Sequence, residues 1–90
     1  MAIATASVTV GTSPTRLDAD PTDLFLGASC AVANPIGGVT VYVGNNGVTT
    51  TSGWPVDPGE KFFATLDPNE TLYGVVATGT QAVRVMRGSV

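Results

Sequence analysis

Acidic side chains are the main residues in this sequence with the potential to do chemistry. Three of the seven carboxylates lie close together, at Asp18, Asp20 and Asp23. A calcium site needs about six to eight oxygen ligands, commonly from a loop with a glycine at its bend and a glutamate at its end. Here no glycine follows the first of these carboxylates until Gly27, no glutamate closes the loop, and Pro21 stiffens its centre. We interpret the cluster as a solvated turn, with a weak cation site as the alternative.

We interpret the other four carboxylates as exposed turn residues and not as a catalytic pair. Each lies beside proline or glycine or in a turn-like setting. They are Asp57, Glu60, Asp67 and Glu70. The chain has no histidine and a single cysteine. This composition excludes a histidine-based triad, a histidine or cysteine metal site and an intrachain disulfide. We therefore expect no enzymatic activity, no metal and no cofactor. Cys30 lies in the apolar stretch 26–33, which predicts a buried and unreactive thiol.

Charge is sparse, with four Lys and Arg against seven Asp and Glu and a net charge of −3. The four cations are spread over positions 16, 61, 84 and 87, so they form no basic patch in the sequence. We expect no nucleic-acid partner and no binding to anionic membranes. No apolar run approaches the roughly 20 residues that span a bilayer. The first residues lack the basic and apolar regions of a signal peptide, so we expect a soluble protein made in the cytosol.

Strand signals dominate the sequence. Thirteen valines and thirteen threonines favour strands, and no stretch of ten residues shows helical apolar spacing without Gly or Pro. The strands are predicted over 6–10, 15–19, 24–33, 39–44, 48–52, 60–66, 71–78 and 81–87. Seven to eight short strands separated by turns indicate an all-β fold, a small antiparallel β-sandwich or barrel without significant helix.

Two hairpins are predicted within this pattern. Asn45-Asn-Gly47 is typical of a tight turn, so 48–52 is expected as the return strand and 53–59 as a loop. A closing hairpin around Gly79 would join 71–78 to 81–87.

The expected positions of two sets of side chains follow from the alternation along the strands. In the closing hairpin, Tyr73, Val75 and Ala77 are expected to share the core with Val83 and Val85. In the stretch 24–33, one side carries larger apolar residues. The other carries small ones, suited to close sheet-on-sheet contact.

Aromatic residues are the remaining informative side chains. Phe62 and Phe63 are consecutive, so on a strand one faces the core and the other faces out. Trp54 either caps the open end of the core, contacts another chain or stacks on a sugar ring. We predict that Trp54, Phe63, Tyr42 and Ile3 contribute to an interface.

The central stretch 39–60 combines VYVG, a small turn, GVTT and PVDPGE, followed by LDPNETLYGV and GTQAVRVM. Over residues 6–87 this pattern resembles small virion structural proteins of tailed bacteriophages, of the capsid-decoration or head-fibre type. The resemblance implies a jelly-roll-like β-sandwich that self-associates, often as a homotrimer, and binds a virion surface. It implies no catalytic residues.

These observations together predict one domain over 1–90, with 1–6 either an arm that orders on a neighbour or a frayed terminus. A domain of this size buries only about 60% of its surface, so we expect assembly to stabilise it. The predicted function is a phage capsid decoration subunit on the virion surface, with the major capsid protein and copies of itself as partners. Two alternatives remain, a tail- or fibre-associated module that contacts host glycan and a cellular carbohydrate-binding domain.

Overall fold

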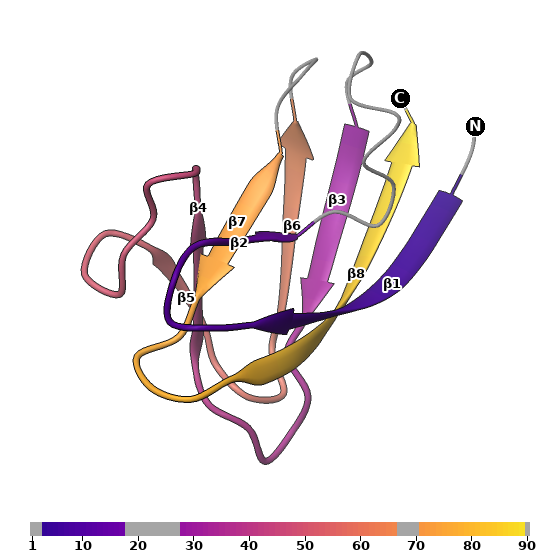
Figure 1. Cartoon of the computed structure of the whole chain (residues 1–90). Coiled ribbons are helices and arrows are strands. Elements are labelled where there is room, and N and C mark those ends of the chain that lie inside the picture. Colours follow the sequence, from indigo (N-terminus) through magenta and orange to yellow (C-terminus); the bar gives the residue numbers. More distant parts are fainter. Residues whose placement is uncertain (1–2, 18–27, 67–70, 90) are drawn as a thin grey trace.

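The computed structural model describes residues 3–17, 28–66 and 71–89 and shows a two-layered β-sandwich (Figure 1). The described residues contain no helix, and so none long and apolar enough to cross a membrane. The all-β fold class expected from the sequence is therefore confirmed. The strands are β1 (Ile3–Val10), β2 (Thr15–Leu17), β3 (Ala28–Ala33), β4 (Val41–Gly44), β5 (Trp54–Val56), β6 (Lys61–Leu66), β7 (Leu72–Val75) and β8 (Gln81–Ser89).

The strands form two antiparallel sheets of four. Sheet A has the order β1-β8-β3-β6, and sheet B has the order β2-β7-β4-β5. The first strand pairs with the last, the second with the seventh, the third with the sixth and the fourth with the fifth. This nested pairing is that of an eight-stranded jelly roll, the arrangement that the sequence resemblance implies. Residues 3–6, part of the predicted N-terminal arm, belong to β1 and pair with 85–88.

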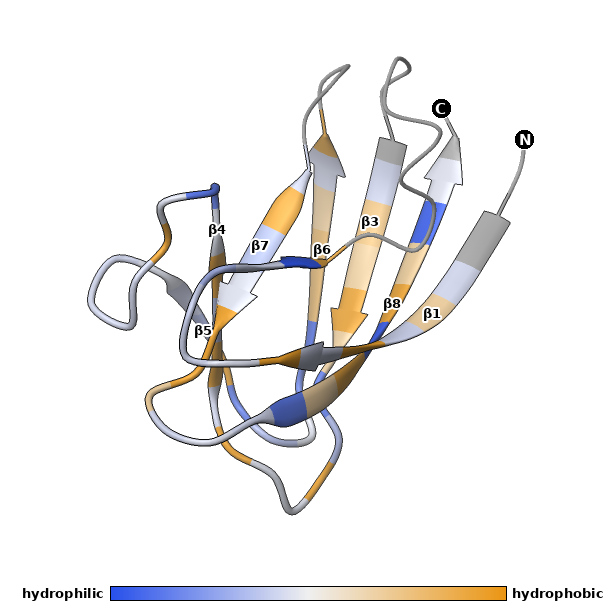
Figure 2. Cartoon of the chain, viewed as in Figure 1, coloured by the Kyte–Doolittle hydropathy of each residue, from blue (hydrophilic) through white to orange (hydrophobic). Residues whose placement is uncertain are grey.

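The core lies between the sheets and is filled by alternate residues of the strands. Figure 2 shows hydrophobic residues of β8 interrupted by hydrophilic ones. Eight of the twelve residues in the described core cluster are valines, so the layer between the sheets is built mainly from short, stiff side chains. The cluster comprises Val10, Leu17, Cys30, Val32, Val41, Val43, Val56, Leu66, Leu72, Val76, Val83 and Val85.

The predicted closing hairpin around Gly79 is wrong, because β7 lies in sheet B and β8 in sheet A. Between them the chain crosses from one sheet to the other, and the Val76 amide donates to the carbonyl of Gly11. Val76 occupies the core instead of Ala77, which is exposed. Tyr73 is likewise not a core residue: it is half-buried on the outer face of sheet B.

The predicted return strand over 48–52 is also wrong. A turn does form at Asn45, whose carbonyl accepts from the Val48 amide at 3.0 Å. Hydroxyl groups then hold the loop, because Thr49 Oγ1 accepts from the Ser52 amide at 3.1 Å. Polar side chains thus provide local hydrogen bonds in place of a strand ladder. The partner of β4 is β5, which lies within the stretch predicted as a loop.

Asn34 joins the two sheets at one end of the sandwich. It follows β3 of sheet A and is only 2% exposed. Its side-chain Nδ2 donates at 2.8 Å to the carbonyls of both Val39 and Val56, which belong to the loop before β4 and to β5. Its backbone amide donates to Glu60, and its carbonyl accepts from Gly59. One buried residue therefore fixes three separate chain segments.

We expect Asn34→Ala to lower the free energy of unfolding by about 2 to 4 kcal/mol, because two carbonyls lose their shared donor inside the protein. Urea unfolding followed by circular dichroism measures the change. Asn46→Ala, at an exposed turn position, is the control and should stay within about 0.5 kcal/mol of the wild type. Equal unfolding midpoints for the two variants would show that the Asn34 amide does not hold the sheets together.

Candidate interaction surface

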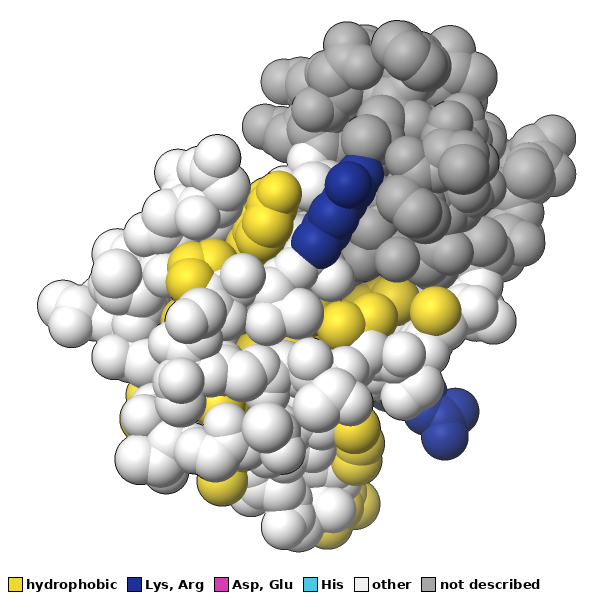
Figure 3. All heavy atoms as spheres, viewed as in Figure 1, with side chains coloured by type: hydrophobic (Ala, Val, Ile, Leu, Met, Phe, Trp, Pro, Cys, Tyr) yellow, Lys and Arg dark blue, Asp and Glu magenta, His cyan; other side chains and the backbone are white. Residues whose placement is uncertain are grey.

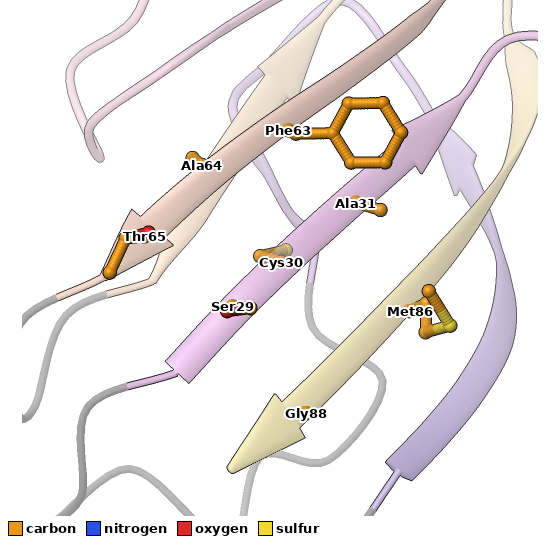
Figure 4. A pocket seen from close by; sticks show the side chains of 8 residues that line it. All are labelled: Ser29, Cys30, Ala31, Phe63, Ala64, Thr65, Met86 and Gly88. Atoms are coloured by element: carbon orange, nitrogen blue, oxygen red, sulfur yellow. The ribbon is translucent and has the colours of Figure 1, made fainter. Parts of the chain in front are cut away.

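The outer face of sheet A carries an exposed apolar row. The strand register aligns four residues across the sheet, and we call them the apolar row: Thr5, Met86, Ala31 and Phe63. Figure 4 shows Phe63 and Met86 projecting from β6 and β8 on either side of Ala31. Phe63 is 70% exposed and Met86 is 44% exposed. Large apolar side chains grouped on a sheet face indicate an interaction surface.

A second row beside it is basic. The register aligns Ser7, Arg84, Ala33 and Lys61, which we call the basic row. Both cations are exposed, and the described residues of this outer face include no carboxylate. This face is therefore positive in a chain whose net charge is −3.

Two shallow depressions lie on this face, one on each side of the apolar row. One, of about 420 Å³, extends from Phe63 and Met86 toward Ser29 and Thr65. The other, of about 600 Å³, extends from the same two side chains toward the basic row. Both linings contain apolar carbon and hydroxyl groups. The second also contains the ammonium group of Lys61 and the guanidinium group of Arg84. This chemistry suits binding by burial and charge pairing rather than proton transfer.

The face of the molecule drawn in Figure 3 does not show an apolar row beside a basic row. Hydrophobic side chains of the described residues appear there as small separate areas among uncharged ones, and the few charged side chains are cations.

The four residues predicted for an interface do not form one surface. Phe63 faces outward from sheet A, as expected. Tyr42 is half-buried on the outer face of sheet B, beside Pro55. Ile3 pairs through its backbone with Gly88, and its side chain lies outside the described residues.

Trp54 lies at the edge of sheet B, on β5. It is 66% exposed, so most of its side chain is left uncovered by the core. Its ring is available for contact with another molecule.

The residues predicted from the sequence did not include Met86 or Ala31, nor the alignment of Arg84 with Lys61 on either side of Ala33. The alternation of side chains along the strands is enough to predict which of these residues face outward. Because Cys30 is inward, Ala31 must be outward. The alignment of Met86 with Phe63 across three strands depends on the strand order, which the sequence does not contain.

No group of three or more His, Cys, Asp or Glu that could hold a metal ion occurs in the described part of the chain. The predicted carboxylate cluster of Asp18, Asp20 and Asp23 lies outside those residues.

Comparison with known proteins supports the fold. No family model matches the sequence, and no curated protein matches it. A solved chain with a similar fold comes from Bacillus endospore appendages, described as a novel family of disulfide-linked pili. It is 18% identical to this chain, with a TM-score of 0.57, and the match covers 99% of this chain and 86% of that one. At this identity the likeness shows the β-sandwich fold.

The adjacent phenylalanines provide a matched pair for testing the outer face. Phe62 packs against the core cluster, whereas Phe63 is on the surface. We expect Phe62→Ala to cost about 2 to 4 kcal/mol of unfolding free energy and Phe63→Ala no more than about 1 kcal/mol. Urea unfolding at low protein concentration compares the two. A larger loss for Phe63→Ala would place Phe63, and not Phe62, in the core.

Cys30 is 4% exposed and packs in the core cluster. We expect its thiol to react with an aromatic disulfide reagent at least about 100-fold more slowly in the native protein than in denaturant. Absorbance of the released thiolate measures both rates. Similar rates in the two conditions would show that the core around Cys30 opens readily to solvent.

Proposed function

We propose that this chain is a structural subunit of a bacteriophage virion, a capsid decoration subunit that stabilises the particle and binds its exterior as an oligomer. The observation that carries the proposal is the outer face of sheet A, where Phe63 and Met86 are exposed on either side of small residues. Its partners are the major capsid protein and further copies of the same chain, and its location is the virion surface.

Burial of this face provides a physical reason for assembly. Apolar surface removed from water contributes about 25 cal/mol per Å², and binding that involves only the folded state stabilises it. A small β-sandwich with a thin core gains proportionally more from such a contact than a large domain does. The side chains at the centre of the face are uncharged, as is usual at the core of an interface.

The sequence resemblance and the fold support the same class of function. Stretch 39–60 and the segments after it resemble phage virion structural proteins, and jelly rolls are frequent in viral capsids. The similar solved chain comes from appendages described as disulfide-linked pili. A fold hosts many functions, so the proposal depends on the exposed face and the resemblance together.

One observation favours a second candidate function, a tail- or fibre-associated module that contacts host glycan. Trp54 is two-thirds exposed at a sheet edge. Aromatic rings with an apolar face and a polar group are suited to stacking against sugars. The position of Trp54, on the sheet opposite to the apolar row, allows the two functions to be tested separately.

The test uses capsids assembled without this protein, to which the purified chain is added. We expect the wild type to cosediment with the capsids and to raise their melting temperature. Phe63→Ser/Met86→Ser should weaken binding by at least about tenfold, because the face that assembly buries loses its two largest apolar side chains. Trp54→Ala should bind capsids as the wild type does, and circular dichroism verifies that each variant is folded.

Two outcomes would contradict the decoration proposal. One is a wild-type protein that neither binds the capsids nor changes their melting temperature. The other is binding of the wild type to a host glycan array that Trp54→Ala abolishes, with no capsid binding, which would favour the tail module.

A further inference from the structure

A second exposed apolar side chain lies at one end of the sandwich. Ile36 is 91% exposed, in the loop between β3 and β4. Its Cγ1 lies 3.3 Å from where a Cβ on Gly59 would be, so the side chain rests on the turn between β5 and β6. Figure 1 shows the loop between β3 and β4 extending beyond the end of β3.

Two carboxylates are fixed beside Ile36. The Glu60 amide donates to the Asp57 carbonyl at 2.9 Å, closing a turn in which Gly59 has a φ of 87°. A glycine at the third position, after proline, suits a type II turn. The Asp57 amide donates to Glu60 Oε1 at 3.0 Å, and Thr40 Oγ1 donates to Asp57 Oδ1 at 2.9 Å.

Both acidic residues are nevertheless exposed. Their carboxylates therefore keep oxygen lone pairs for an external cation. We call Ile36, Asp57, Gly59 and Glu60 the acidic knob.

The larger depression on the outer face of sheet A has the complementary chemistry. Its lining includes the cations Lys61 and Arg84, the apolar side chains of Phe63 and Met86, and the small residue Ala33. The strands that carry Phe63 and Met86 are separated by β3, so they lie about 10 Å apart.

We propose that the acidic knob of one copy binds the larger depression of a second copy. Ile36 contacts the apolar side chains of the depression, while Asp57 and Glu60 pair with Lys61 and Arg84. This inference deepens the proposed function, because it names the contact that forms the oligomer. It is also tested separately, because self-association is measured in the absence of capsids.

The charges point to a second copy rather than an unrelated partner. Two carboxylates match two cations, and each pair lies beside exposed apolar carbon. The two carboxylates do not pair with the two cations of the same chain. Among the described residues, no salt bridge links Asp57 or Glu60 to Lys61 or Arg84. Opposite charges across an interface set its orientation and exclude wrong partners.

The contact joins two different surfaces, so it is head-to-tail rather than two-fold symmetric. Such a contact closes into a ring when the rotation between copies allows it and otherwise forms a filament. The homotrimer that the sequence resemblance implies would be a ring of this kind.

Sedimentation equilibrium of the full chain, over a range of protein concentrations, tests the contact. The wild type should self-associate. Raised salt should weaken the association, because the charged side chains of the basic row and the acidic knob are exposed to solvent. Lys61→Glu/Arg84→Glu reverses the depression, and Asp57→Lys/Glu60→Lys reverses the knob. Each variant alone should associate at least about tenfold more weakly than the wild type. An equal mixture should regain association, because each reversed surface then meets its opposite.

Asp57 and Glu60 also hold their turn, so Ile36→Ser serves as a knob variant with little risk to folding. It should weaken association by at least about tenfold, whereas Trp54→Ser, a control at another exposed apolar position, should not.

Three results would overturn the proposal. The first is a wild type that stays monomeric even while it binds capsids, which would leave capsid decoration standing but exclude the oligomer. The second is association lost in Lys61→Glu/Arg84→Glu but kept in both knob variants, which would indicate a symmetric contact between two sheet faces. The third is a mixture of the two charge-reversed variants that stays as weak as each variant alone.

Discussion

A single buried amide sets the geometry at one end of this sandwich. Asn34 follows the last residue of β3 in sheet A, and it donates to the carbonyl of Val39, in the loop before β4, and to that of Val56, in β5 of sheet B. Apolar contact between two sheets is non-directional and would permit sliding, whereas these hydrogen bonds fix one relative position. The two loops at this end are therefore held against each other. The exposed residues that they carry, Ile36 and Asp57 among them, have defined places as a consequence.

The outer face of sheet A follows from the same strands that fill the core. Inner positions of β3 need bulk to meet sheet B, and Val32 provides it. The outer positions have no such requirement, and they hold Ser29, Ala31 and Ala33. Because β3 lies between β6 and β8, small outer residues leave a hollow between the larger side chains of its neighbours. An inner strand lined with small residues is thus a place where another surface can approach closely.

The class of fold is readable from the sequence because alternation and turn residues are local properties. Strands such as 60–66 and 81–87 were predicted within a few residues of β6 and β8. The partner of each strand depends on contacts between distant residues. The sequence around Gly79 looks like a hairpin although its two strands lie in different sheets. The alternation predicts that one of Phe62 and Phe63 faces outward, but the alignment of Phe63 with Met86 depends on the strand order.

Low charge gives the few ionic groups on this molecule a defined role. At physiological salt the Debye length is about 8 Å, so isolated surface charges act mainly at contact distance. Glu60 and Lys61 are consecutive, yet one belongs to the turn and the other to the start of β6, which places opposite charges on different surfaces. With little net repulsion between subunits of charge −3, burial of apolar carbon provides the affinity. The charged pairs then determine which surfaces meet and in which orientation.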